Sequence, residues 1–339
     1  MIDLRTDALS RPTDEMWAAM RAAEVGWAYL GEDPSVNELE RLGAGLLGKE
    51  AAVLVPTCTA ANLLALMTLG TRGTQVILDP TAHSATSEAR GYEAICGLRA
   101  GFVEARSGCP DPGAVEEAIL VARKAGVVTT VLCLENTHNN AGGVAVLPER
   151  MAALGALAHR HGVSVHLDGA RLLNAAAALG VPATRLTEDV DTVSLSLGKG
   201  LSAPCGALLA GPRAVIDRAR VNLRVIGAAS LHKAGIFAAA GIVALKSMID
   251  RLADDNRRAR QLGTGLAALS GIHVDLDTVQ TNIVLADTTG PAADALLGRL
   301  ASRGVLGFRR SDTRIRFVTH RLIGDAEVSR AIAAVAASL

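Results

Sequence analysis

The chain is predicted to be an α/β protein, with a mainly parallel sheet in a large N-terminal domain and a smaller α+β domain after it. Short β-branched runs alternate with helical patterns rich in Ala, Leu, Glu and Arg over most of the 339 residues. This alternation requires crossover connections, which give a parallel sheet covered by helices on both faces. The length exceeds what one hydrophobic core usually serves. Because the pattern changes near residue 234, we expect domains at 1–245 and 246–339.

The elements of the large domain are predicted from the spacing of apolar residues. The run VVTTVLCL is typical of a central strand buried on both faces, and Pro112 and Pro148 stand where a first helical turn tolerates proline. The expected strands are 52–55, 75–78, 101–104, 127–134, 163–167, 192–197 and 207–210. The expected helices are 35–47, 62–69, 112–124, 148–161 and 213–224.

The smaller domain is expected to begin with a long Ala-rich helix, from about 234 to 269. Alternating runs at 272–277, 282–286 and 314–319 predict strands, and the segments 291–303 and 325–338 predict helices. No internal repeat or low-complexity linker is visible in the sequence. The second domain is therefore expected to be a small α+β unit attached through one long helix.

Composition excludes several classes of protein. There are 34 Lys+Arg against 34 Asp+Glu, so the formal net charge is zero, and half of the residues are hydrophobic. High hydrophobicity with low net charge excludes disorder, and a neutral chain offers no general attraction for nucleic acid or anionic lipid. The five cysteines are odd in number, dispersed and without CxxC spacing. A disulfide framework or zinc site is not expected, and a reducing cytoplasm fits best.

Residues 51–71 contain no charge over 21 positions, a length sufficient to span a bilayer. However, Pro56, Thr57, Thr59 and Asn62 interrupt this segment, and its first residues alternate as in a strand. A buried strand, a polar turn and an Ala/Leu helix explain it better than a membrane span. A secretory leader is not expected at residues 1–7, since Asp3, Arg5 and Asp7 are charged. We expect a soluble cytoplasmic protein.

Polar residues gather where the expected parallel strands end, which is where ligands bind in open α/β sheets. In VPTCTAAN, Thr57, Cys58 and Thr59 lie between a strand and a helix. Hydroxyl groups and free N–H groups there can bind an anion, although a simple helix cap by threonine is the more common arrangement for such a turn taken alone. The segment LENTHNNAGG places polar residues 135–139 after a buried strand, where they must bind a ligand or one another.

Two further strand ends complete the pattern. VSVHLDGAR places Asp168 and Arg171 after one strand, and LSLGKG places Lys199 between two glycines after another. A pyridoxal cofactor needs a lysine for its imine, an acid that keeps its ring nitrogen protonated and an anion pocket for its phosphate. Lys199, Asp168 and the turn at 57–59 can supply these three functions.

The sequence resembles the L-threonine aldolases, which belong to the aspartate-aminotransferase-like (fold type I) pyridoxal phosphate enzymes. The resemblance covers most of the chain, and its motifs occur in the family's order. They are MIDLRTDALSRPT, GEDPSVNELE, LLGKEAAVLVPTCTAAN, LENTHNNAGG, HLDGARLLNAA, LGKGLSAPCG and RIRFVTH. It implies pyridoxal 5'-phosphate as cofactor, no metal, an amino acid substrate and a homodimer or homotetramer.

The resemblance also implies roles at the cofactor. Lys199 matches the lysine that binds the cofactor, and Asp168 matches the partner of its ring nitrogen. Cys58 and Thr59 occupy the phosphate-binding turn, where the family has Gly-Thr. His83, in TAHSATSEA, matches the histidine that stacks on the ring. We expect Lys199, Asp168 and His83 to be catalytic.

On the substrate side, His138 matches the family's histidine near the substrate hydroxyl, where it would act as a base directly or through water. Thr6, Arg171 and Arg316 match the positions that hold the substrate carboxylate, and Arg171 also lies near the cofactor in the family. Arginine suits this role because its planar fork binds a carboxylate bidentately. Thr6 stands where the family usually has serine.

This chain departs from the family around the expected pocket. Trp27 and Leu30 replace an aspartate and a tyrosine, and Gly198 replaces the serine before the lysine. The family's glycine-rich GGGMRQ segment corresponds to LRVIGAASLHK, which contains Ser230, His232 and Lys233. The added apolar bulk predicts a substrate larger than threonine. Alternatively, Trp27 and Leu30 pack at a subunit contact.

The resemblance predicts a lyase that cleaves a β-hydroxy-α-amino acid, threonine-like or bulkier, to glycine and an aldehyde. A second hypothesis keeps the cofactor but assigns β-elimination, transaldol transfer or a biosynthetic condensation. A third is a non-catalytic homologue, which the presence of Lys199, Asp168, Arg171 and Arg316 disfavours. Fold resemblance alone does not choose among these reactions.

Overall fold

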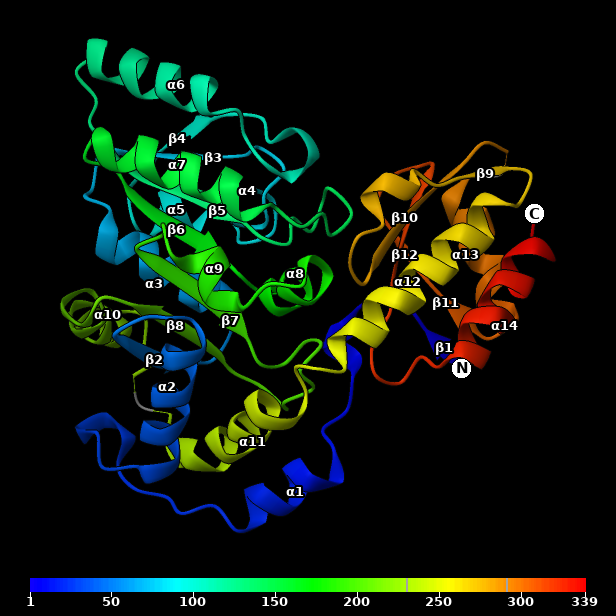
Figure 1. The fold of residues 1–339 in the computed structure, drawn as a ribbon, viewed down its shortest axis with the longest axis horizontal. Helices are drawn as coiled ribbons and strands as arrows, with labels where there is room; N and C mark the ends of the chain where they lie inside the picture. Colours follow the sequence, from blue (N-terminus) through cyan, green and yellow to red (C-terminus); the bar gives the residue numbers. More distant parts are fainter. Residues whose placement is uncertain (230, 291) are drawn as a thin grey trace.

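The computed structural model describes residues 1–229, 231–290 and 292–339, which form a large and a small lobe (Figure 1). A seven-stranded sheet runs through the large lobe in the order β2-β8-β7-β6-β5-β3-β4. β8 runs antiparallel to β2 and β7, whereas the β3–β4, β3–β5, β5–β6 and β6–β7 pairs are parallel, which confirms the mainly parallel prediction. The strands are β2 (Ala51–Val55), β3 (Gln75–Leu78), β4 (Arg99–Phe102), β5 (Thr129–Glu135), β6 (Ser164–Asp168), β7 (Thr192–Ser196) and β8 (Ala207–Gly211).

Helices cover both faces of this sheet because alternate strand residues point to opposite sides. On β2, Val53 packs in one core with α3 and α10, whereas Ala52 packs in another with α2, α6, α7 and α11. The longer helices are α2 (Pro34–Leu46), α3 (Cys58–Leu69), α6 (Pro112–Lys124), α7 (Pro148–Arg160), α10 (Arg213–Val225) and α11 (Ala234–Ser247). The shorter ones are α1 (Asp14–Arg21), α4 (His83–Thr86), α5 (Gly91–Ala94), α8 (Leu172–Leu179) and α9 (Ala183–Thr187).

The small lobe contains a four-stranded antiparallel sheet of order β12-β13-β10-β9, with three helices packed beside it (Figure 1). The chain's first strand, β1, pairs in parallel with β11 of this lobe, and Ile2 and Leu4 join its core. The start of the chain therefore packs outside the large domain predicted at 1–245. The elements are β1 (Ile2–Asp3), β9 (Ile272–His273), β10 (Ile283–Thr288), β11 (Val305–Leu306), β12 (Phe308–Arg309), β13 (Arg314–Val318), α12 (Leu252–Ala267), α13 (Ala293–Ser302) and α14 (Asp325–Ala336).

The prediction of one long helix over 234–269 is wrong, because the chain forms two helices there, α11 and α12. Ala238 and Ala240 of α11 are buried in the large-lobe core, whereas Leu262 and Leu266 of α12 are buried in the small-lobe core. Since each helix buries its apolar face in a different core, the chain changes direction between them. The domain boundary at 245 stays a prediction.

Most other predicted bounds agree with the structure within a few residues. α3 begins at Cys58 rather than 62, because the Thr57 side chain accepts a hydrogen bond from the backbone N–H of Ala60 and caps the helix. β4 starts two residues earlier than expected, and only Ile272–His273 of the run 272–277 is a strand. Pro291, the first residue of one expected helix, lies outside the described residues.

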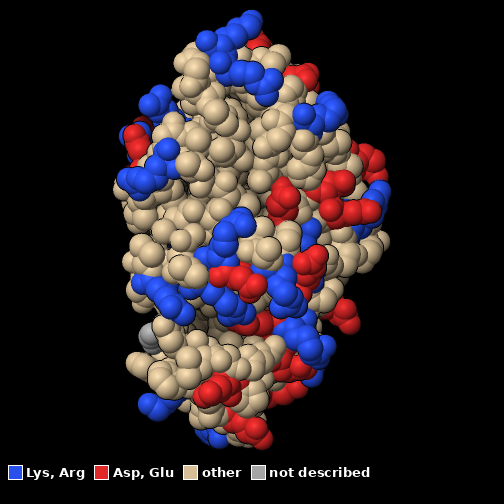
Figure 2. All heavy atoms as spheres, turned by 90° about the vertical axis from the view of Figure 1, so that its left-hand side faces the viewer, with Lys and Arg blue, Asp and Glu red and all other residues tan. Residues whose placement is uncertain are grey.

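Charged side chains of both signs intermingle on the face that Figure 2 shows, beside broad uncharged areas. This view of the large lobe agrees with the equal numbers of acidic and basic residues in the sequence. Among the described residues, no helix combines the length and the apolar character that a membrane crossing requires.

Candidate active site

The loops at the carboxyl ends of β2, β3, β6 and β7 enclose a pocket of about 290 Å³. This is the edge where open α/β sheets bind ligands. The structure brings five of the predicted site residues together in the pocket lining, which sequence spacing alone could not establish. They are Cys58, Thr59, His83, Asp168 and Lys199.

Lys199 follows β7, in a tight loop between Gly198 and Gly200. Its backbone carbonyl accepts hydrogen bonds from the Ser10 hydroxyl at 2.9 Å and from the Ser202 N–H at 2.8 Å. A side-chain carbon at Gly200 would lie 2.9 Å from the Leu252 side chain, so a larger residue would have to displace that side chain. These contacts hold the lysine backbone at the pocket while its side chain lines the cavity.

Asp168 ends β6 and is almost completely buried. Its Oδ1 accepts from the N–H of Ala170 at 3.0 Å, and its Oδ2 accepts from the amide of Asn62 at 2.7 Å. Burial disfavours the charged form, but the positive charges of Lys199 and His83 and these hydrogen bonds lower the pKa of Asp168. The pocket therefore contains an ionised carboxylate with little access to water.

Backbone approach at the end of β6 explains the glycine in LDGAR. A side-chain carbon at Gly169 would lie 2.5 Å from the carbonyl oxygen of Ser194 on β7. No other residue fits at that distance without moving a strand. Gly169 thus permits the turn that places Asp168 and Arg171 at the same edge of the sheet.

His83 begins the short helix α4 and lies about one-third exposed at the pocket. Its Nδ1 is 2.8 Å from Oε1 of Glu88, and this hydrogen bond raises the pKa of His83. Burial in turn raises the pKa of Glu88, with a further contribution from the negative charge of Asp168. The backbone N–H of His83 donates to Glu135 at 2.8 Å.

The turn at 57–59 contains the helix cap that the sequence suggested, while its anion-binding role stays a prediction. Thr57 caps α3, while Thr59 is exposed at the pocket and lies in the first turn of the helix, where free N–H groups favour an anion. The Cys58 thiol donates to the Ser194 hydroxyl at 3.2 Å. Burial raises the pKa of Cys58 to about 12, so it stays a neutral thiol.

Two buried arginines meet beside the pocket, at the oxygen of the Asn139 side chain. Nη1 of Arg171 donates to this oxygen at 3.2 Å, and Nη1 of Arg316 donates to it at 3.0 Å. Arg171 is bound by the carboxylate of Asp7, which lies next to the predicted Thr6. Thr6 itself caps the short 3₁₀ helix Asp7–Leu9 by accepting from the N–H of Ala8.

Arg316 has no carboxylate partner among the described residues, and its buried Nε–H has no hydrogen-bond acceptor there. Its Nη2 donates to the carbonyl of Arg5 at 3.1 Å, and its guanidinium lies over the Phe308 ring. Burial, together with the charges of Arg171 and Arg310, lowers the pKa of Arg316 to about 10. A buried cation in this state favours an added carboxylate.

His138 lies apart from the Lys199 pocket. It lines a separate small cavity, with its Nε2 2.9 Å from Oδ2 of Asp79 and its Nδ1 accepting from the N–H of Ala141. Both ring nitrogens are thus engaged within the protein. Asp79 raises the pKa of His138, against the effect of burial. The catalytic role of His138 stays a prediction.

Of the residues that differ from the family, Gly198 lines the pocket beside Lys199, whereas Trp27 and Leu30 do not line the pocket of their own chain. Trp27 is 57% exposed and Leu30 is 55% exposed, and the Trp27 ring stacks with Tyr29. His232 is exposed, and Lys233 precedes α11 with a positive φ of 60°. Ser230 lies outside the described residues.

Sequence reasoning missed three buried residues that contact the site, namely Asp7, Asn62 and Glu88. Asp7 follows Thr6 directly, Asn62 ends the motif VPTCTAAN and Glu88 lies five positions after His83. Polar residues inside quoted motifs were thus a usable signal. Their partners, however, are distant in sequence.

The side chains of His83, Glu88 and Asp168 each place a possible metal-ligand atom within 4.8 Å of the others. The hydrogen bonds of these side chains account for that clustering.

The site fits pyridoxal phosphate on three observations. A buried ionised carboxylate can pair with the ring nitrogen, a lysine lines the same pocket, and a capped helix N-terminus faces it. These features come from different strand ends but share one cavity. Lys199, Asp168 and the turn at 57–59 would hold the group.

Comparison of the sequence with known proteins identifies the family to which this chain belongs. The model of the family described as beta-eliminating lyase matches residues 3–289. Low-specificity L-threonine aldolase 1 of Arabidopsis thaliana is 37% identical over 334 residues, which cover 96% of this chain and 93% of that protein.

Solved structures agree with the fold. A threonine aldolase from Leishmania major superposes with a TM-score of 0.85 at 18% identity, covering 99% of this chain and 98% of that one. An aspartate aminotransferase from Rhodobacter sphaeroides gives a TM-score of 0.74 at 21% identity, covering 99% and 90%. The fold is that of the fold type I pyridoxal phosphate enzymes, as predicted. This chain therefore belongs to the beta-eliminating lyase family, as a pyridoxal phosphate-dependent lyase of the threonine aldolase group.

Proposed function

We propose that this enzyme cleaves the Cα–Cβ bond of a β-hydroxy-α-amino acid to give glycine and an aldehyde. The observation that carries the proposal is the presence of Lys199 and a buried, ionised Asp168 in one pocket. The printed names of the relatives, which are threonine aldolases, point to the same reaction. When bound, pyridoxal phosphate supplies an electron sink for the pair released by bond cleavage.

Each side chain of the site has a separate role in binding the cofactor or the substrate. Lys199 holds the cofactor covalently, and the Asp168 carboxylate keeps a proton on the ring nitrogen. Arg316 binds the substrate carboxylate, because its buried guanidinium has no carboxylate partner among the described residues. Arg171 borders the same place but is already neutralised by Asp7.

The substrate hydroxyl must lose its proton as the bond breaks. Of the two predicted histidines, only His83 lines the pocket, and its Nε2 is free of the bond that Nδ1 makes to Glu88. We assign His83 Nε2 as the atom that accepts the proton of the substrate hydroxyl. Glu88 increases the basicity of the His83 ring through its hydrogen bond to Nδ1. His138 would order the 135–141 segment through Asp79 and Ala141.

The proposal is tested by incubating the holoenzyme with threonine, allo-threonine and phenylserine and identifying the products by mass. Glycine with the matching aldehyde is the expected result. Ammonia with a keto acid would instead assign β-elimination. A protein that binds no pyridoxal phosphate would indicate the non-catalytic homologue.

We also propose a cytoplasmic homodimer, or a dimer of dimers. Apolar side chains near Trp27 support the assembly, since Val225 is 72% exposed and Arg224 lies over the Tyr29 ring. Contiguous exposed apolar patches, unlike single exposed side chains, mark contact surfaces. The five free cysteines support a reducing compartment. Light scattering of the purified holoenzyme should give at least twice the chain mass of 34.9 kDa.

A further inference from the structure

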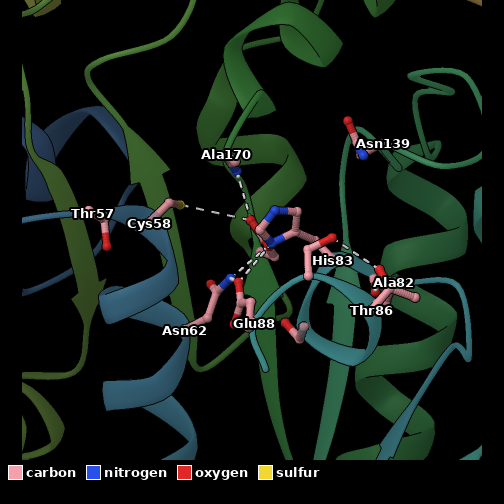
Figure 3. Close-up of polar contacts among 12 residues, drawn as sticks. Thr57, Cys58, Asn62, Ala82, His83, Thr86, Glu88, Asn139 and Ala170 are labelled. Atoms are coloured by element: carbon pink, nitrogen blue, oxygen red, sulfur yellow. Dashed lines mark hydrogen bonds and ion pairs between the residues drawn. The ribbon is translucent and has the colours of Figure 1, made fainter. Parts of the chain in front are cut away.

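Asn62 connects groups that reach the pocket from three different parts of the sheet. It lies in the second turn of α3 and is fully buried. Its Nδ2 donates to Oδ2 of Asp168 at 2.7 Å and to Oε1 of Glu88 at 2.9 Å. Figure 3 shows Asn62, Glu88 and His83 pointing toward one another. One amide group therefore joins two carboxylates.

The orientation of this amide is fixed by its other end. Oδ1 of Asn62 accepts from the Ser194 hydroxyl at 2.8 Å and lies 3.0 Å from Nε2 of His166. Burial lowers the pKa of His166 to about 4, so the ring is neutral and must donate through Nε2. Nδ1 of His166 then accepts from Thr192 at 2.9 Å. Because carboxylates only accept, the NH₂ group must face them.

The position requires the chemistry of an amide. Asp168 and Glu88 carry like charges, and the charge of Asp168 raises the pKa of Glu88. A single side-chain nitrogen with two N–H groups can satisfy both carboxylates without adding a charge. A hydroxyl has one donor, and a carboxylate has none while adding a third negative charge. Asn62 thus keeps two neighbouring carboxylates apart and oriented.

We infer that Asn62 is a positioning residue that links Asp168 to the Glu88–His83 pair, so that the ring-nitrogen carboxylate and the pocket histidine are held by one hydrogen-bond network. The inference rests on the cofactor site assigned above and goes beyond the proposed reaction. The charged or titratable groups that interact electrostatically with Asp168 from the surrounding elements include Lys199, His83, Glu88, Cys58, Cys133, His138, His166 and Arg171.

The test is a double-mutant cycle with Asn62→Ala, Asp168→Ala and the double variant, made as holoenzymes. Without substrate, the bound cofactor's absorbance is titrated against pH. In Asn62→Ala, losing the donor raises the pKa of Asp168, so the acid transition should move up by about one pH unit. With substrate, kcat should fall about 10-fold, with KM changing less than about 3-fold.

If Asn62 acts through Asp168, the same change made in the Asp168→Ala background should cost less than about 3-fold in kcat. Additive losses in the cycle, or an unchanged absorbance titration in Asn62→Ala, would overturn the inference. The titration needs no turnover, so its outcome is independent of which reaction the enzyme catalyses.

Asn222→Ala is the matched control. Asn222 lies on α10, and its amide donates at 3.1 Å to the hydroxyl of Thr68, near the C-terminal end of α3; neither residue lines the pocket. It should lower Tm without moving the absorbance titration. Where Asn62→Ala folds poorly, Asn62→Ser retains one donor and should give a smaller shift in the same direction. A shift of equal size in the Asn222 variant would show that helix α3 is merely loosened.

Discussion

The guanidinium of Arg171 binds the carboxylate of Asp7 bidentately, with Nε–Oδ2 at 2.7 Å and Nη2–Oδ1 at 2.8 Å, and both side chains are buried. The two residues are 164 positions apart. Asn282 of the small lobe also donates to Asp7, at 3.1 Å. The pair therefore ties the N-terminal arm to both lobes and removes Arg171 from the free cations of the site.

Replacement of Asp7 by Ala should be strongly destabilising, because it leaves a buried guanidinium without its counter-charge. The expected loss is about 3–5 kcal/mol in the free energy of unfolding. Denaturant unfolding measures it. Asp3→Ala is the control, since its pair with Arg5 is exposed and such pairs contribute about 0–1 kcal/mol. Equal losses in both variants would contradict a structural role for the Asp7 pair.

The same pair predicts a pH dependence of stability. The pKa of Asp7 is well below its ordinary value, since the charge and hydrogen bonds of Arg171 outweigh burial. The folded protein therefore binds fewer protons here than the unfolded chain. Asp7 stabilises the fold above its unfolded pKa of about 4, and this contribution is lost as the pH falls below that value. In the Asp7→Asn variant, the free energy of unfolding, measured by denaturant titration at several pH values, should fall less steeply as the pH is lowered below about 4.

Borohydride reduction of the holoenzyme should attach pyridoxal phosphate to the peptide that contains Lys199. This lysine lines the same pocket as Asp168, so its amine can reach a cofactor bound there. Peptide mass mapping identifies the labelled residue. Label on Lys49, Lys124 or Lys233 would show that the cofactor is held elsewhere.

Asp168→Ala should retain some cofactor binding but lose most turnover, on the order of 10²-fold or more in kcat, as the loss of preorganised electrostatic groups typically does. The reason is that the buried carboxylate holds the proton on the ring nitrogen. Cofactor affinity and kcat are measured on the same preparation. A fully active variant would require another acid at the ring nitrogen.

Arg316→Lys should raise KM for the amino acid about 10-fold or more, because a lysine cannot bind a carboxylate with a planar fork. The change should cost less stability than the same change at Arg171, since Arg316 loses hydrogen bonds to Asn139 and Arg5 but no carboxylate partner among the described residues. Arg171→Lys is the comparison and should lower Tm more, because it disrupts the bidentate pair with Asp7. A larger KM effect from Arg171 than from Arg316 would reverse the assignment.

Substrate preference should reflect the presence of apolar Leu30 where the family has a tyrosine. We expect kcat/KM to be higher for phenylserine than for threonine, and Leu30→Tyr to shift the ratio toward threonine by about 10-fold. Leu30 is 55% exposed and does not line the pocket of its own chain. This effect therefore requires that Leu30 of one subunit reach the pocket of another. A threonine preference that the substitution leaves unchanged would place Leu30 in a simple packing contact.

The sequence predicted the features that depend on local chain geometry. The alternation of strands and helices, the helix start at Pro112 and the polar residues after each strand follow from periodicity and backbone preferences, which act over a few residues. Lys199 and Asp168 could be paired in advance because both follow parallel strands, whose carboxyl ends share one edge of the sheet. The bounds of the strands in the large lobe accordingly lay close to those observed.

Only the tertiary structure decided which polar groups are partners. Nothing local shows that Asp7 neutralises Arg171 and leaves Arg316 without a carboxylate, or that Asn62 reaches Asp168 across 106 positions. Likewise, the break between α11 and α12 depends on which core each helix enters. The physical reason is that a buried charge or amide is stabilised by whatever packing brings within hydrogen-bond distance, and this is fixed by the assembled fold rather than by neighbouring residues.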